Sequence, residues 1–260
     1  MIEDAWAARV TKRRSTVLLV LPAVGWALAL VTAAPSVAAD PFAGVKITSA
    51  LVIGNSKYLN LEPLLNPSND AVALAAALRK RGIPVSLKLD ADLRALKAEI
   101  AEFRKQNKPG STSLFFFSGH GWNLQNRNYI FGVDAPKGDD LLAGKNLDQV
   151  LLVADVYAGI AGRMLVLLDT HGNPSEVPNN VVLSYSGSTS HEALDSYPLP
   201  DGKMSQNSPY TASLIETLDG NHKNLPTAFL DLSQRVVDKT NGAQIPWVSR
   251  SINAAASWTP

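Results

Sequence analysis

Two short stretches of the sequence decide the fold: Phe115-Phe116-Phe117-Ser118-Gly119-His120-Gly121 and Leu167-Leu168-Asp169-Thr170-His171. Each is a continuous apolar run that ends in polar residues and a histidine, a pattern typical of a buried strand whose end reaches the surface. The carboxyl ends of parallel strands meet at one edge of a sheet, where ligands bind in α/β folds. We therefore expect His120 and His171 to lie at the same edge.

Further apolar runs alternate with helical patterns along the chain. Strands are expected at residues 47–53, 84–89, 113–117, 128–133, 164–168, 181–185 and 244–248. Helices are expected at residues 71–81, 147–157, 209–218 and 227–240, and also where Leu93, Leu96, Ile100 and Phe103 recur at helical spacing. This alternation predicts an α/β fold with a mostly parallel sheet covered by helices on both faces.

The composition is that of a globular protein. The chain has 260 residues, of which 46% are hydrophobic and 18% charged, and its net charge is +1. A chain of this length can bury a large core without disulfides. Near-neutral charge argues against a nucleic-acid partner, which usually requires a basic face. The complete lack of cysteine excludes disulfides, thiolate metal sites and thiol catalysis.

The first forty residues differ in character from the rest. Lys12, Arg13 and Arg14 precede an apolar run over residues 17–31, and small residues at Val37 and Ala39 follow it. This order is typical of a secretory signal. We therefore expect a signal peptide at residues 1–39, a single domain at 40–260, and export to the periplasm or beyond, with no stable membrane span after cleavage. An uncleaved anchor is the alternative, but the run is shorter than the roughly 20 residues of a spanning helix.

The order and spacing of several motifs resemble one family, the caspase and metacaspase-like cysteine peptidases, and especially their bacterial branch. The similar segments are 50–58, 65–71, 116–121, 128–130, 201–202, 207–211 and 240–247. The resemblance implies a caspase-like three-layer sandwich, with a mostly parallel central sheet between helices. It also implies that His120 corresponds to the catalytic histidine, and that Asp169 and Asp201 belong to a pocket for a basic side chain, in a groove with Ser118 and Gly119.

The resemblance breaks at the nucleophile. In the bacterial branch the corresponding strand ends Asp-Ala-Cys, commonly followed by Arg-Asn-Asn-Pro, whereas this chain has Asp169-Thr170-His171-Gly172-Asn173-Pro174. His171 occupies the cysteine position, and His120 is left as a relic general base. Because a thiol mechanism requires a thiolate, the resemblance carries over the fold and not the chemistry.

Two classes of function remain open. The first, which we favour, is an inactive pseudopeptidase that binds a peptide or protein partner in the relic groove and needs no cofactor. The second is a hydrolase that pairs His120 with Ser118, or holds a metal between His120 and His171. A zinc site would need a third ligand, for which the candidates are Asp169, Asp134 and His191. Thr170 is expected to face away from His171, because neighbours on a strand alternate.

Overall fold

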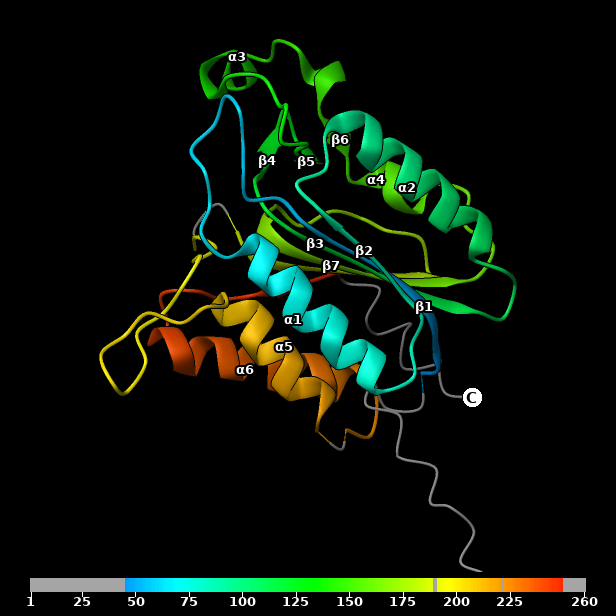
Figure 1. Ribbon diagram of the computed structural model, residues 1–260. Coiled ribbons are helices and arrows are strands. Elements are labelled where there is room, and N and C mark those ends of the chain that lie inside the picture. The colour runs from blue at the N-terminus through cyan, green and yellow to red at the C-terminus, as the bar shows by residue number, and fades with distance from the viewer. Residues whose placement is uncertain (1–44, 189–190, 221, 250–260) are drawn as a thin grey trace, which may run out of the picture. The chain divides into compact units, whose positions relative to one another are not determined.

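The computed structural model describes residues 45–188, 191–220 and 222–249 (Figure 1). A sheet of six strands runs in the order β2–β1–β3–β7–β8–β9. Its first five strands are parallel, and the last pairs antiparallel with β8. The strands are β1 (Ile47–Gly54), β2 (Val85–Leu89), β3 (Thr112–Ser118), β7 (Arg163–His171), β8 (Val181–Gly187) and β9 (Trp247–Val248). The predicted parallel sheet is confirmed.

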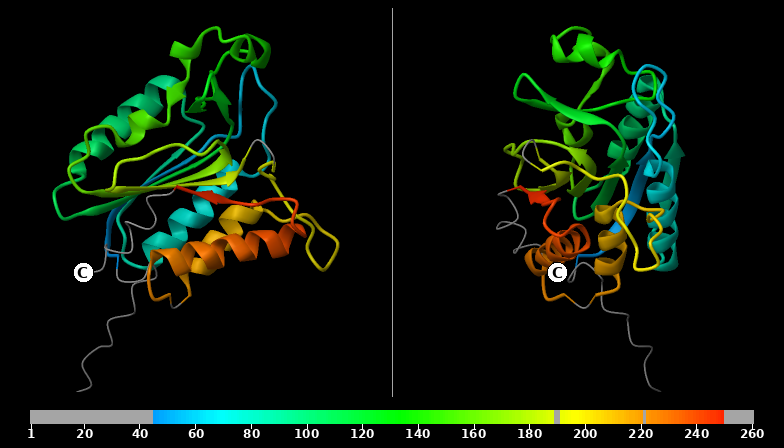
Figure 2. Two further views of the ribbon diagram at one scale, coloured as in Figure 1. Left: turned by 180° about the vertical axis from the view of Figure 1, so that it is seen from behind. Right: turned by 90° about the vertical axis from the view of Figure 1, so that its left-hand side faces the viewer.

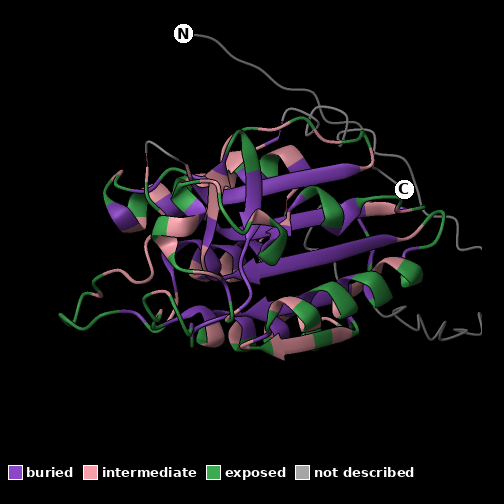
Figure 3. Ribbon diagram, turned by 90° about the horizontal axis from the view of Figure 1, so that it is seen from above, coloured by how far each residue is buried: buried purple, intermediate pink, exposed green. Residues whose placement is uncertain are grey.

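Helices cover both faces of this sheet (Figures 1 and 2). On one face lie α1 (Pro67–Lys80), α5 (Pro209–Leu218) and α6 (Leu225–Thr240), and on the other lie α2 (Leu93–Gln106) and α4 (Ala154–Tyr157). Alternate residues of the central strands enter the two cores, as for Phe116 on the first face and Phe117 on the second. The central strands are buried along their length (Figure 3). These three layers confirm the predicted sandwich.

A second, smaller sheet follows the end of β3. It comprises β4 (Gly121–Leu124), β5 (Arg127–Ile130) and β6 (Leu151–Leu152), all antiparallel. Its hairpin turns at Gln125 and Asn126, whose φ angles of 50° and 60° are those of the tight turn that suits twisted strands. The chain between β5 and β6 includes the short helix α3 (Gly138–Leu142).

The helix predicted over residues 147–157 is wrong. The segment is divided into a turn of 3₁₀-helix at Leu147–Gln149, strand β6 and the single-turn helix α4. The backbone of β6 pairs with β5, and Leu151 and Val150 enter two different hydrophobic clusters. Packing in two directions over-rides the local helical preference. The strand predicted over 128–133 is also shorter and has β4 as an unpredicted neighbour.

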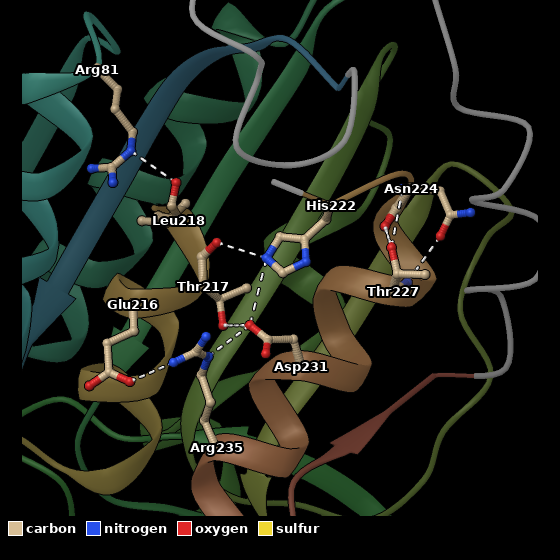
Figure 4. Close-up of polar contacts among 9 residues, drawn as sticks. All are labelled: Arg81, Glu216, Thr217, Leu218, His222, Asn224, Thr227, Asp231 and Arg235. Carbon is tan, nitrogen blue, oxygen red and sulfur yellow. Dashed lines mark hydrogen bonds and ion pairs between the residues drawn. The ribbon is translucent and has the colours of Figure 1, made fainter. Parts of the chain in front are cut away.

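Helices α5 and α6 are joined by a polar cluster on their outer side (Figure 4). Arg235 pairs with Asp231 at 2.8 Å and with Glu216 at 3.1 Å. The ring Nε2 of His222 lies 3.0 Å from the carbonyl oxygen of Thr217. Each half-exposed pair contributes little alone, and together the contacts link the last turn of α5 to α6.

No helix in the described part of the chain is long and apolar enough to cross a membrane. The signal peptide predicted at residues 1–39 lies outside the described residues.

Candidate functional site

The carboxyl ends of β3 and β7 form the floor of a pocket of about 110 Å³. The two strands are direct neighbours, with Ser118 opposite Asp169 in register. The pocket is lined by five of the six predicted site residues: Ser118, Gly119, His120, Asp169 and His171. The two histidines therefore share one pocket at the edge where they were expected, although His171 is the last residue of its strand and does not lie beyond it.

Tyr58 holds His120 in place. The backbone N–H of His120 donates to the Tyr58 hydroxyl at 2.8 Å, and the two rings lie 4.6 Å apart, centre to centre. The ring Nε2 lies 2.8 Å from the carbonyl oxygen of Glu62. A carbonyl oxygen only accepts hydrogen bonds, so Nε2 carries the proton. Burial lowers the pKa of His120, which keeps the ring neutral near pH 7.

Gly119 allows the Tyr58 hydroxyl to lie close to the backbone of His120. Its φ of 152° is one that other residues rarely adopt, and a Cβ there would lie 2.6 Å from the Tyr58 hydroxyl oxygen. Any side chain would therefore push Tyr58 away from the backbone of His120.

The Nε2 atom of His171 has the opposite hydrogen-bonding role to that of His120. Its Nε2 accepts the backbone N–H of Ala193 at 3.1 Å. The neutral ring must then carry its proton on Nδ1. The pKa of His171 is lowered mainly by burial, with Glu192 acting in the opposite direction and His120 adding to the decrease. His171 thus anchors residues 193–195, which form one wall of the pocket.

Two buried carboxyl groups lie at the base of the pocket. Asp169 accepts hydrogen bonds from the hydroxyl groups of Ser208 and Thr211, the latter at 2.7 Å. Asp70 accepts from the Ser208 backbone N–H at 3.0 Å and from the Ser118 hydroxyl at 3.1 Å. Ser208 therefore bridges the two acids, and it also caps α5 by accepting the N–H of Thr211.

In the described part of the chain no cationic side chain is paired with either carboxyl group. Burial raises the pKa of Asp70 to about 8, and the nearby Asp169 raises it further. Burial likewise raises the pKa of Asp169 to about 6. Over the described ranges neither group forms an ion pair with a lysine, arginine or histidine. Asp70 was missed from the sequence, where the stretch 66–70 indicated only the start of a helix.

The wall formed by residues 193–195 adds a third carboxyl group, that of Asp195. The Asp195 carboxylate accepts the backbone N–H groups of Leu65, at 2.8 Å, and Asn66, at 3.2 Å, and Asp195 lines the pocket. Asp201, predicted for this role, does not line it. Its side chain is 55% exposed and pairs with Lys203 at 3.3 Å. The turn that carries Asp201 closes on itself, since Leu199 donates to the Lys203 carbonyl oxygen.

The caspase domain model matches residues 47–256, which is most of the chain. The chain belongs to the caspase domain family. Among solved structures, that of protein GSU0716 from Geobacter sulfurreducens is similar, with a TM-score of 0.53 and 14% identity over 78% of this chain and 92% of that one. At that identity the likeness supports the fold alone. No curated protein matches the sequence.

Neither hydroxyl group beside the two pocket histidines of this caspase domain is hydrogen-bonded to a histidine, as far as the structure describes the chain. The Ser118 hydroxyl donates to Asp70, and the Thr170 hydroxyl donates to the carbonyl oxygen of Gly121 at 3.2 Å. The side chains of Thr170 and His171 contact different segments, since Thr170 packs against Gly121 of β4 and the His171 ring accepts from Ala193. The register between β7 and β8 shifts between Leu168 and His171.

The metal-dependent alternative also lacks support in this domain. Within the described ranges no group of three or more histidine or carboxylate side chains could hold a metal ion. Both Nε2 atoms of the histidine pair are already engaged by backbone groups, and Asp134 accepts the backbone N–H of Leu93 at 2.8 Å.

Proposed function

We propose that this caspase domain is a pseudopeptidase that holds a peptide or protein partner by a basic side chain. The observation that carries the proposal is the pair of buried carboxyl groups, Asp70 and Asp169, at the base of a pocket with no cation of its own among the described residues. Buried carboxylates are costly unless a positive charge balances them. A guanidinium or ammonium group from a partner would supply that charge.

The size of the pocket favours one side chain over a small-molecule ligand. Pockets for drug-sized ligands usually measure about 300–1,000 Å³, whereas this one measures about 110 Å³. It has room for the head of a single lysine or arginine. The rest of the partner would then lie over the rim, where His120 and His171 are half-buried.

The absence of a thiol supports binding without cleavage. The chain has no cysteine, and His171 stands where the nucleophile is expected. Loss of one member of a nucleophile–histidine pair typically removes several orders of magnitude in rate. A neutral imidazole attacks amides poorly, so His171 does not replace the thiolate.

A binding assay with matched ligands tests the proposal. Peptides that contain arginine should bind at least about tenfold more tightly than the same peptides with citrulline, which keeps the shape of arginine and removes its charge. Asp169→Asn should abolish this preference. Asp201→Asn is the matched control, because it removes an exposed carboxylate on a neighbouring loop.

Equal binding of the arginine and citrulline peptides would refute the proposal. Rapid hydrolysis of the arginine peptide by the unmodified protein, lost in His120→Ala, would also refute it and would favour a hydrolase. An equal loss of preference in Asp169→Asn and Asp201→Asn would place the basic side chain elsewhere.

We also propose that the protein acts after export from the cytoplasm. The support is the sequence of residues 1–39, with its basic segment, apolar run and small residues before the expected cleavage site. Intact-mass analysis of the protein from its native host should find a chain that begins near residue 40. A mature chain that retains residues 1–39 would indicate an anchor instead.

A further inference from the structure

The two histidines of the pocket are held as opposite tautomers. His120 must carry its proton on Nε2, because that atom faces the Glu62 carbonyl oxygen at 2.8 Å. His171 must carry its proton on Nδ1, because its Nε2 accepts the Ala193 N–H at 3.1 Å. Both assignments follow from fixed backbone partners, since a carbonyl oxygen cannot donate a hydrogen bond and an amide N–H does not accept one.

Each ring therefore has one nitrogen left for a ligand, and the two nitrogens are complementary. Nδ1 of His120 is an acceptor, and Nδ1–H of His171 is a donor. Among the described residues neither atom has a hydrogen-bond partner. Neither is among the buried polar atoms that lack partners, so both retain contact with solvent. Both rings line the same pocket, and between them they have one acceptor nitrogen and one donor nitrogen without a partner among the described residues.

We infer that the histidine pair recognises a peptide bond of the bound partner, whose N–H donates to His120 Nδ1 and whose carbonyl oxygen accepts from His171 Nδ1–H. The inference rests on the proposed function. The peptide bond is one of the two that flank the basic residue held by Asp70 and Asp169, because those carboxyl groups line the same pocket. A peptide unit has the matching donor and acceptor.

This arrangement gives His171 a definite role. Where a nucleophile would attack a carbonyl carbon, His171 donates a hydrogen bond to the carbonyl oxygen and leaves the bond intact. The ring is suited to the role because burial lowers its pKa, so that it stays neutral and its Nε2 remains an acceptor for Ala193. A protonated ring would lose that acceptor and release the adjoining wall.

The tautomers can be tested in the free protein. Nitrogen chemical shifts of the two rings near pH 7.5 should assign the proton of His120 to Nε2 and that of His171 to Nδ1. The reverse tautomer at either ring would overturn the inference.

Backbone-edited ligands test the recognition itself. The probes are an arginine peptide, two esters that each replace one flanking N–H by oxygen, and two alkene analogues that also lack the carbonyl. One ester should bind the wild type about 2- to 12-fold more weakly than the peptide, as expected for one lost hydrogen bond. In His120→Ala, the same ester should bind as tightly as the peptide does. In the wild type, the matching alkene should bind more weakly still than the ester, whereas in His171→Phe it should bind as the ester does.

A rescue variant distinguishes the loss of hydrogen bonds at position 171 from a change in the size of its side chain. His171→Asn places an amide at the position, with one acceptor and one donor, and should restore part of the carbonyl effect that His171→Phe removes. Equal ester effects in the wild type and in His120→Ala would overturn the inference. If arginine is then still preferred over citrulline, the proposed function stands without it. If the preference is absent, both fail.

Discussion

Replacing Asp70 by asparagine removes one ionisable carboxyl group from the base of the pocket and keeps its shape. Asparagine Oδ1 can still accept from the side chain of Asn207 and the backbone of Ser208, which bond to the carboxyl group at 2.9 and 3.0 Å. The Ser118 hydroxyl, which now donates to Asp70, can rotate to accept from the new amide. The variant should therefore fold normally, and its stability should differ from that of the wild type through the lost titration of this carboxyl group.

The size of the effect follows from the pKa of Asp70, which burial raises from 3.8 to about 8. A raised pKa favours the protonated form in the folded state. Stability is then complete below pH 3.8 and falls as the pH rises through the folded value. At pH 7 the cost is roughly 4 kcal/mol, from about three pH units at 1.36 kcal/mol each. The Asp70→Asn variant avoids that cost and should be more stable by up to this amount.

Urea denaturation at pH 5, 7 and 8 gives the required comparison. The free energy of unfolding of Asp70→Asn should exceed that of the wild type by an amount that widens by roughly 3.6 kcal/mol between pH 5 and pH 8. His120 and His171, whose pKa values are lowered, lose stability toward acid pH in both proteins, so their contribution cancels. Asp201→Asn is the control and should track the wild type. A difference that does not change with pH, or a variant less stable at pH 8, would refute the electrostatic account.

Three other predictions follow from the same geometry. The affinity for an arginine peptide should rise from pH 5.5 to pH 8, because Asp169 and Asp70 ionise with pKa values of about 6 and 8. Calorimetry should detect proton release on binding, and tighter binding at pH 5.5 would contradict the prediction. His171→Cys should react with iodoacetamide yet hydrolyse basic-residue peptides no faster than the unmodified protein, because it also removes the acceptor for the wall; fast turnover would contradict it. Tyr58→Phe should lower the free energy of unfolding by about 1–3 kcal/mol in urea titrations, because it leaves the His120 N–H without its acceptor; a loss below about 0.5 kcal/mol would mean that water replaces the hydroxyl.

The central part of the fold could be predicted because its strands are continuous apolar runs. Phe115, Phe116 and Phe117 face both cores, so no other arrangement than a buried central strand suits them. The same logic located the candidate site, since the polar residues that end two adjacent parallel strands must meet at one edge. It failed for residues 147–157, where the chain divides its apolar residues between two clusters and pairs with β5.

Sequence patterns did not predict which acidic residues line the pocket. Asp70 resembles any carboxylate in the first turn of a helix, and long-range contacts, such as that with Ser208, 138 positions later, bring it into the pocket. Asp195 and Asp201 belong to the same irregular loop. The backbone N–H groups of Leu65 and Asn66 select Asp195, and a local turn holds Asp201 at the surface. Contacts between residues so far apart in the chain produce no periodic pattern in the sequence.

The features of the pocket that oppose stability are the ones that a partner would use. Two carboxyl groups are buried without a cation among the described residues, and two imidazoles are fixed as opposite tautomers with one nitrogen each unpaired. Natural sequences usually depart from local consistency at functional sites. A basic side chain would relieve the first conflict, and a peptide bond would satisfy the second. Because both demands meet in a single pocket, one ligand segment with a basic residue can satisfy them together, and the binding of that segment should stabilise the fold.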